Sequence, residues 1–313
     1  MSDQRLRTRF FVVDAFTSSE YPELKGNPAG VLISTRPLED DVAIEIARRL
    51  ALPALAIISD PGLFNSTDYP HAHADLPIAW LGPEGTFLPL CGHATMATSL
   101  VLFDLFPAVQ ELNLVARSGK KIHVARAGKG ATIAFPALPT PTPAEVASCA
   151  RALQVLSTAA SLQESDVLHV AESRADQTAH PNLLVELKQG FDLQGMSIDP
   201  KLLVQLPYRG VWLVTAGPKH DSSIDMQTRV FFPSIGLLED HVCGSAHTLF
   251  MPYWASKYAV KAGQEEEVSL VSRQVSPRGG LLKLRWNNKW GSEDGICWLT
   301  GEGIIQDMGA LDV

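Results

Sequence analysis

The feature that most constrains this sequence is a pair of similar tetrapeptides separated by about half of the chain. Residues 91–94 read Cys-Gly-His-Ala, and residues 243–246 read Cys-Gly-Ser-Ala. A short apolar segment precedes each tetrapeptide, and a stretch of helical character follows it, over residues 95–103 and 247–258. A similar element that recurs at half of the chain length predicts two related halves, each with its own turn into a helix.

A Cys-Gly pair at the start of a helix has a specific chemistry. It places a thiol beside free backbone N–H groups and the positive end of the helix dipole, which favours the thiolate and binds anions such as carboxylates. Two such turns facing each other would form one cleft with two proton-transfer groups. The alternative is that small residues only allow a tight turn into a buried helix, with cysteine as a small hydrophobic residue.

Length, charge and cysteine content narrow the class of protein. The chain has 313 residues, enough for two domains with separate cores. Its net charge of −8, without any cluster of Lys or Arg, argues against nucleic acid or an anionic membrane as partner. The N-terminal segment has no apolar signal core, so we expect a cytoplasmic protein. The four cysteines lack zinc-site spacing, so we expect free thiols and no structural metal: Cys91, Cys149, Cys243 and Cys297.

Short strands are expected to outnumber helices in both halves. Helices are predicted over residues 40–50, 144–156 and 200–206, and a Gly-Asn-Pro-Ala-Gly turn at 26–30. Strands are expected at 9–16, 31–34, 54–59, within 71–90, and at 111–116, 121–125, 131–135, 166–171, 182–187, 211–215, 227–232, 268–274, 280–286 and 296–301. This pattern predicts a curved, mostly antiparallel sheet around a central helix in each half. The mostly apolar helices after Cys91 and Cys243 are expected to be the central ones.

A proline-rich segment, residues 136–143, marks the expected boundary between the halves. We expect an N-terminal half over residues 1–138, a stiff linker over 139–143 and a C-terminal half over 144–302. The strand 303–313 is expected to complete the N-terminal half.

Four groups of residues resemble the signatures of the PhzF (phenazine-biosynthesis isomerase-like) family. They are Asp14-Ala15-Phe16-Thr17 with residues 26–29, residues 88–95, residues 229–233 with 239–247, and residues 274–280 with Gly301 and Gly309. The resemblance implies an α+β, diaminopimelate epimerase-like fold: two pseudo-symmetric halves, each a sheet around a central helix, with the active site between them. It also implies an isomerase that moves a proton on a small, carboxylate-bearing metabolite without metal or cofactor, and a possible homodimer.

The chain departs from the family pattern at three positions. The glutamate that shuttles the proton in phenazine isomerases falls on Ala54, and the nearest carboxylates, Glu45 and Asp60, cannot be assigned its role from spacing. Alanine cannot transfer a proton, so the phenazine-type mechanism does not carry over. His241 replaces the usual proline after the family aspartate, and Phe87 replaces an acidic residue, which indicates a more apolar pocket.

Two sets of side chains remain as candidates for catalysis. Cys91 and Cys243 occupy positions that resemble the paired thiols of diaminopimelate epimerases and proline racemases, although both could be inherited packing. His93 and Asp240 are the second set, because the resemblance places both at the family's cleft and His titrates near neutrality. The alternative for His93 is a hydrogen bond to backbone, and for Asp240 a helix cap.

Four further residues are candidates for binding the substrate. Gly92, Gly244 and Ser245 would offer backbone N–H groups, and Ser245 a hydroxyl, to a carboxylate or enolate oxygen. Asn27 is expected to reach the same pocket, or else to cap its turn.

Three functions therefore stay open. The first is a cofactor-independent isomerase or epimerase with a small-molecule substrate, and the second is a biosynthetic cyclase or pericyclic catalyst that uses a shaped pocket with His93 and Asp240. The third is a catalytically inactive relative that binds a metabolite or a protein.

Overall fold

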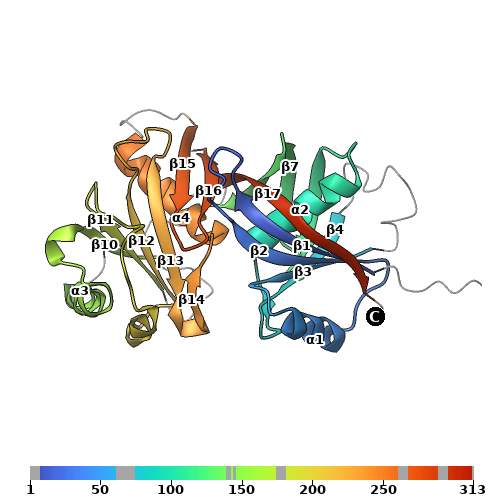
Figure 1. Cartoon of the computed structure of the whole chain (residues 1–313), viewed down its shortest axis with the longest axis horizontal. Coiled ribbons are helices and arrows are strands. Elements are labelled where there is room, and N and C mark those ends of the chain that lie inside the picture. Colours follow the sequence, from blue (N-terminus) through green and yellow to red (C-terminus); the bar gives the residue numbers. More distant parts are fainter. Residues whose placement is uncertain are drawn as a thin grey trace, which may run out of the picture. The chain divides into compact units, whose positions relative to one another are not determined.

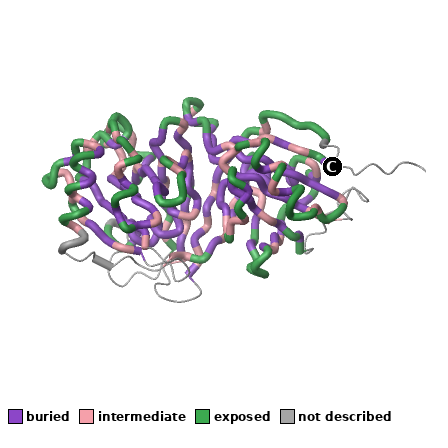
Figure 2. The backbone as a smooth tube through the Cα atoms, turned by 90° about the horizontal axis from the view of Figure 1, so that it is seen from below, coloured by how far each residue is buried: buried purple, intermediate pink, exposed green. Residues whose placement is uncertain are grey.

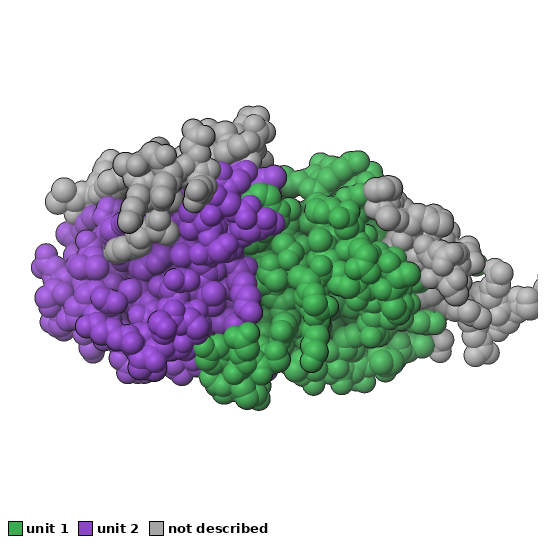
Figure 3. Space-filling model, turned by 90° about the horizontal axis from the view of Figure 1, so that it is seen from above, with its two compact units in different colours: residues 1–135, 298–313 green, residues 136–297 purple. Residues whose placement is uncertain are grey.

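The computed structural model describes residues 8–60, 75–138, 142–143, 146–173, 181–259, 267–287 and 295–311. The chain divides into two compact units (Figure 3). Unit 1 contains Met1–Phe135 and Trp298–Val313, and unit 2 contains Pro136–Cys297. In both units the buried stretches of backbone, purple in Figure 2, follow the strands and the central helix.

Unit 1 is a ring of strands around a helix (Figure 1). Its strands are β1 (Thr8–Thr17), β2 (Asn27–Ser34), β3 (Leu55–Ser59), β4 (Asp75–Leu81), β6 (Glu111–Ala116), β7 (Lys121–Ala127), β8 (Gly130–Pro136) and β17 (Ile296–Leu311). Each pairs with the next in this order, and β17 pairs with both β8 and β1, which closes the ring. The helix inside is α2 (Gly92–Leu105), buried from Gly92 to Phe103. A helix that is apolar on all sides is stable only in such a position.

Unit 2 is built from a second curved sheet and its own central helix. The strands, in pairing order, are β9 (Thr142–Pro143), β10 (Val167–Ser173), β11 (Asn182–Leu187), β12 (Gly210–Ala216), β13 (Met226–Phe232), β15 (Val268–Gln274) and β16 (Gly280–Trp286). The short strand β14 (Leu237–Asp240) pairs with β13 and leads into the central helix α4 (Gly244–Trp254), which a π-helical turn, η4 (Ala255–Ala259), extends.

Helices on the outer surfaces complete both units. In unit 1, α1 (Asp40–Leu50) covers an apolar cluster on the sheet, and acidic residues at its start and basic residues at its end complement the helix dipole. In unit 2, α3 (Val146–Ala160) and the 3₁₀ helix η2 (Pro200–Gln205) cover an apolar cluster of that unit. Two shorter 3₁₀ turns follow: η1 (Glu164–Asp166) connects α3 to β10, and η3 (Pro233–Ile235) connects β13 to β14.

The two units repeat one strand pattern. The pairs β2–β3 and β4–β6 are parallel, whereas β3–β4 and β6–β7 are antiparallel. In unit 2 the pairs β11–β12 and β13–β15 are parallel, whereas β12–β13 and β15–β16 are antiparallel. In each unit a short strand, β5 (Phe87–Leu88) or β14, pairs with the strand before it and precedes the Cys-Gly turn. The predicted pair of related halves is therefore confirmed.

Three local predictions are wrong. Residues 27–30 belong to strand β2, and only Gly26 has the turn conformation, with φ +68° and a hypothetical Cβ 2.4 Å from the Ala15 carbonyl oxygen. The strands expected over 296–301 and 303–313 form one continuous strand, β17, of which Glu302–Leu311 pair with β1. In the proposed linker, Thr142 and Pro143 form β9 on β10, whereas residues 139–141 lie outside the described part of the chain.

Candidate functional site

Both Cys-Gly turns have the geometry of a helix start. Cys91 is the N-cap of α2, with φ −142° and ψ 109°, and Cys243 is the N-cap of α4, with φ −103° and ψ 96°. The glycines that follow are therefore the first residues of their helices. The first N–H groups of an α-helix have no partner within the helix, so both turns have the backbone donors expected of Gly92, Gly244 and Ser245.

The first turn brings a thiol and an imidazole together. The sulfur of Cys91 lies 3.6 Å from Nδ1 of His93, and both side chains are buried, with 7% and 8% of their surface exposed. The Thr95 hydroxyl donates a 2.6 Å hydrogen bond to the Cys91 carbonyl oxygen, which also accepts the Thr95 backbone N–H. The His93 ring therefore lies close enough to the thiol to exchange a proton with it.

The second turn combines a thiol with a hydroxyl and a carboxylate. The Cys243 sulfur lies 3.4 Å from the Ser245 hydroxyl oxygen. Burial raises the pKa of Cys243 well above its ordinary value, and the neighbouring charge of Asp240 raises it further. The Ser245 hydroxyl and the Ala246 N–H act in the opposite direction but are outweighed. The expectation that a helix start lowers the thiol pKa is therefore wrong for Cys243. The free-energy cost of desolvating the thiolate exceeds the stabilisation that the helix end provides.

Asn27 and Ala54 both lie in unit 1 and are fully buried. Asn27 is the first residue of β2 and lies opposite Ala15 of β1. The Ala54 carbonyl accepts the Gly30 N–H at 2.9 Å. Glu45 pairs with Arg49 at 2.7 Å on the exposed side of α1, so it does not replace the missing glutamate.

Phe87 packs near the outer helix α1 of unit 1. Its ring packs on the apolar cluster beneath α1, and the Arg117 guanidinium lies 3.9 Å from the ring centre. Arg117 also forms two hydrogen bonds to Asp40, of 2.8 and 3.0 Å. Phe87 lines cavities of about 300 and 240 Å³ on this outer surface, and that it makes the substrate pocket more apolar stays a prediction.

The other two cysteines have the surroundings of packing residues. Cys149 is half-buried against the apolar cluster beneath α3 in unit 2. Cys297 is buried with its sulfur 3.6 Å from the Thr248 carbonyl oxygen, and burial raises its pKa to about 12.

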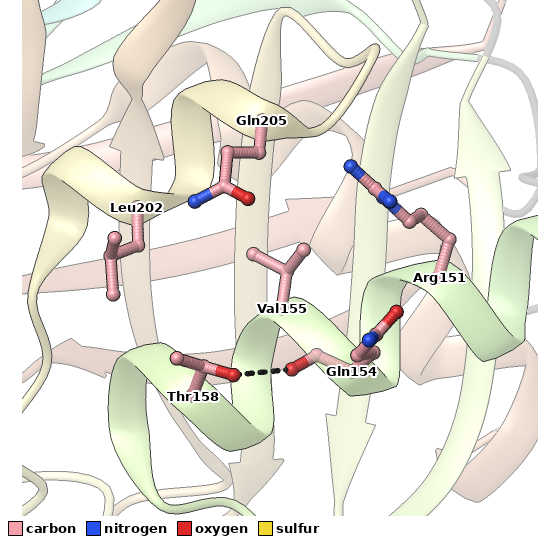
Figure 4. A pocket seen from close by; sticks show the side chains of 6 residues that line it. All are labelled: Arg151, Gln154, Val155, Thr158, Leu202 and Gln205. Atoms are coloured by element: carbon pink, nitrogen blue, oxygen red, sulfur yellow. Dashed lines mark hydrogen bonds between the residues drawn. The ribbon is translucent and has the colours of Figure 1, made fainter.

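A crease of about 100 Å³ lies between α3 and η2 in unit 2 (Figure 4). It is lined by Arg151, Gln154, Val155, Thr158, Leu202 and Gln205. The hydrogen bond drawn there runs from the Thr158 hydroxyl to the Gln154 carbonyl oxygen. None of the residues predicted to act on a substrate lines this crease.

The residues that sequence reasoning missed lie behind the second turn. Gln274 accepts the Cys243 N–H at 2.8 Å, and His247 lies with Nδ1 2.7 Å from the Cys243 carbonyl oxygen. Ser272 contacts the other nitrogen of His247 at 2.8 Å. One signal was present in the sequence, because Thr95 and His247 each follow their cysteine by four residues.

No helix among the described residues is long and apolar enough to cross a bilayer. Within the same residues, no group of three or more His, Cys, Asp or Glu side chains is placed to hold a metal ion.

Comparisons with known proteins cover nearly the whole chain. The family model described as phenazine biosynthesis-like protein matches residues 13–309. Phenazine biosynthesis-like domain-containing protein 2 of Mus musculus is 29% identical, over 98% of this chain and 99% of its own length. An uncharacterised isomerase of Pseudomonas aeruginosa is 31% identical, over 96% of this chain and 99% of its own.

Solved structures show the same fold. A PhzF-family protein of Enterococcus faecalis has a TM-score of 0.74 and 26% identity, covering 98% of this chain and 100% of that one. A hydroxyproline epimerase of Agrobacterium vitis, with 14% identity and a TM-score of 0.56, covers 99% of this chain and 92% of its own. The predicted epimerase-like α+β fold is confirmed.

Proposed function

The chain belongs to the phenazine biosynthesis-like (PhzF) family, and from this premise we propose that it is a cofactor-independent isomerase or epimerase. Its substrate is a small metabolite that carries a carboxylate or carbonyl group beside the carbon that loses a proton. The observation that carries the proposal is the unequal chemistry of the two turns. Cys91 lies beside a proton acceptor, His93, whereas burial and Asp240 keep Cys243 protonated.

In the proposed reaction both turns act on one substrate. The substrate carboxylate accepts hydrogen bonds from the N–H groups of Gly92, Gly244 and Ser245, and Asn27 orients it. These donors also stabilise the negative charge that develops when the C–H bond breaks.

Proton transfer then proceeds from one turn to the other. Cys91 passes its proton to His93, and the resulting thiolate removes the substrate proton. The carbanion takes the thiol proton of Cys243, either on the opposite face of the same carbon or at a conjugated carbon. Solvent reprotonates the Cys243 thiolate and removes the extra proton from His93, which restores the starting state.

The buried state of Cys243 also supports a second assignment within this function. A thiol whose pKa is raised is a poor base at neutral pH, so Asp240 can act as the base at the second turn while the thiol only donates. A cyclase or pericyclic reaction that uses His93 and Asp240 would need no C–H exchange.

The test is deuterium incorporation in D₂O. The protein is incubated with a panel of 2-amino acids, 2-hydroxy acids and unsaturated diacids, and deuterium at carbon is measured by mass spectrometry. We expect incorporation that Cys91→Ser and Cys243→Ser abolish and that the control Cys149→Ser leaves intact. Turnover without deuterium would establish the pericyclic alternative instead. Binding of a panel compound that survives both cysteine substitutions, with no turnover, would show a binding protein.

We expect a homodimer from the family resemblance, which sedimentation equilibrium measures directly.

A further inference from the structure

We propose that His247, Ser272 and Gln274 are positioning residues that hold the second Cys-Gly turn, and with it the Cys243 thiol, in the geometry required for proton donation. The inference rests on the proposed function only in the role it gives to Cys243. None of the three side chains has any exposed surface, so none can touch a substrate directly in this structure.

Gln274 holds the start of the turn through both ends of its amide group. Its Oε1 accepts the Cys243 N–H at 2.8 Å, and its Nε2 donates to the Asp240 carbonyl oxygen at 2.6 Å. The N–H can only donate and the carbonyl can only accept, so this orientation of the amide is the one that satisfies both. A single side chain thereby fixes the distance between the backbone of Asp240 and that of Cys243.

His247 holds the other side of Cys243. Its Nδ1 lies 2.7 Å from the Cys243 carbonyl oxygen, which cannot donate, so Nδ1 must carry a proton. Burial lowers the pKa of His247 to about 4, so the ring is neutral and its Nε2 carries no proton. Nε2 therefore accepts from the Ser272 hydroxyl, whose oxygen lies 2.8 Å away. The two hydrogen bonds run in one direction, from Ser272 through His247 to Cys243.

A buried polar layer of this kind fixes a geometry more than it adds stability. The free-energy cost of removing polar groups from water cancels much of the stabilisation from their hydrogen bonds, and an apolar layer would pack as well. What the polar layer adds is direction, because each bond has a preferred angle and length. Here these directions meet at the N–H and the carbonyl of one residue, the N-cap whose thiol lies near Asp240 and Ser245.

The experiment measures the alkylation rate of Cys243 by iodoacetamide against pH, peptide by peptide, with Cys91 and Cys149 as internal references. His247→Leu removes both ring nitrogens at similar volume. We expect the released turn to admit water to the Cys243 thiol. The thiol should then be alkylated about ten-fold faster at pH 8 than in the unchanged protein, as for a thiol pKa about one unit lower. His247→Asn keeps a donor near the Nδ1 position, and we expect its rate to stay within about three-fold of the unchanged protein.

A matched control separates positioning from general loosening. Thr215→Val removes another buried hydrogen bond of the same sheet, from the Thr215 hydroxyl to the Lys188 carbonyl oxygen at 3.0 Å. The two variants are compared at equal loss of thermal stability. If His247→Leu increases the alkylation rate of Cys243 no more than Thr215→Val does, the inference is wrong. Should His247→Leu not fold, the same alkylation measurement is made on Gln274→Met and Ser272→Ala. Both should also increase the alkylation rate of Cys243.

The outcome is independent of whether the proposed reaction is correct. Alkylation needs no substrate, so the positioning role can hold even if Cys243→Ser leaves turnover intact, which would refute the thiol chemistry alone. Where a substrate is available, His247→Leu should lower kcat more than it raises KM, since proton donation depends on this turn, whereas Gly92 and Asn27 still bind the substrate.

Discussion

The two Cys-Gly turns share a backbone but place their histidines differently. In unit 1 the histidine is His93, two residues after the cysteine and beside its sulfur; in unit 2 it is His247, four residues after the cysteine and behind the turn. The residue four positions after the cysteine has the same role in both units, because Thr95 and His247 each donate a hydrogen bond to the carbonyl oxygen of their cysteine. The repeat has conserved the support of the turn while its chemistry has changed.

In the proposed reaction this difference gives each turn a separate task. A thiol beside an imidazole can lose its proton readily, whereas a buried thiol beside a carboxylate keeps it. A symmetric pair of turns would work equally well in both directions, but an unequal pair defines which face of a substrate loses the proton and which receives it.

The strongest test of this comparison is to replace each thiol separately. We expect Cys91→Ser and Cys243→Ser each to lower the rate of deuterium exchange by about 10²- to 10⁴-fold, the usual contribution of a positioned acid or base. Cys149→Ser should leave the rate unchanged. If Cys243→Ser retains most of the rate, Asp240 is the group that acts at the second turn.

The buried histidine should also affect stability at acidic pH. The pKa of His247 is about 4 in the folded chain, below its ordinary value of 6.5, so the unfolded chain binds the proton first as the pH falls. We expect the free energy of unfolding, measured in urea, to fall by about 3 kcal/mol between pH 6.5 and pH 4 because of this group. Above pH 6.5 its contribution is constant.

The variant His247→Asn should remove that part of the pH dependence, whereas the exposed His220→Asn should leave it. An unchanged slope in His247→Asn would mean that the ring is protonated in the folded chain, against the donor pattern inferred above.

The groups two residues after each cysteine should differ in importance. We expect His93→Asn to lower the exchange rate by about 10²-fold, because the proton acceptor of Cys91 is lost. Ser245→Ala should cost only about ten-fold, because it removes one hydroxyl and leaves the backbone N–H. Equal losses in the two variants would contradict the division of tasks.

The smallest expected effect concerns the support of the first turn. Thr95→Val removes the 2.6 Å bond to the Cys91 carbonyl oxygen, and we expect about 1 kcal/mol less stability in urea. Thr98→Val removes the comparable 2.8 Å bond to the Ala94 carbonyl oxygen three residues further on. Both should cost similar stability, but only Thr95→Val should change the alkylation rate of Cys91.

The sequence predicts much of the fold because its strongest signals are local. The bounds of α1 follow from its apolar spacing and from the acidic and basic residues at its ends. The central position of α2 follows from its lack of a polar side. The repeat itself follows from two short segments.

What could not be predicted depends on contacts between distant residues. Gln274 meets Cys243 across 31 positions, and Ser272 meets His247 across 25, so no spacing rule connects them. The same holds for the pKa of Cys243, since the helix start is visible in the sequence but the depth of burial is not. Gly-Asn-Pro indicates a turn at Asn27, yet pairing with β1 draws these residues into a strand.

The long strand β17 bears on how the chain folds as it is synthesised. Unit 2 is continuous, from residue 136 to 297, whereas the ring of unit 1 needs residues on both sides of it. A ribosome releases the first strands of unit 1 early, but β1 and β8 must wait for β17 before their free edges are paired. Unit 2 can fold during that interval, so the unit that begins first is the one completed last.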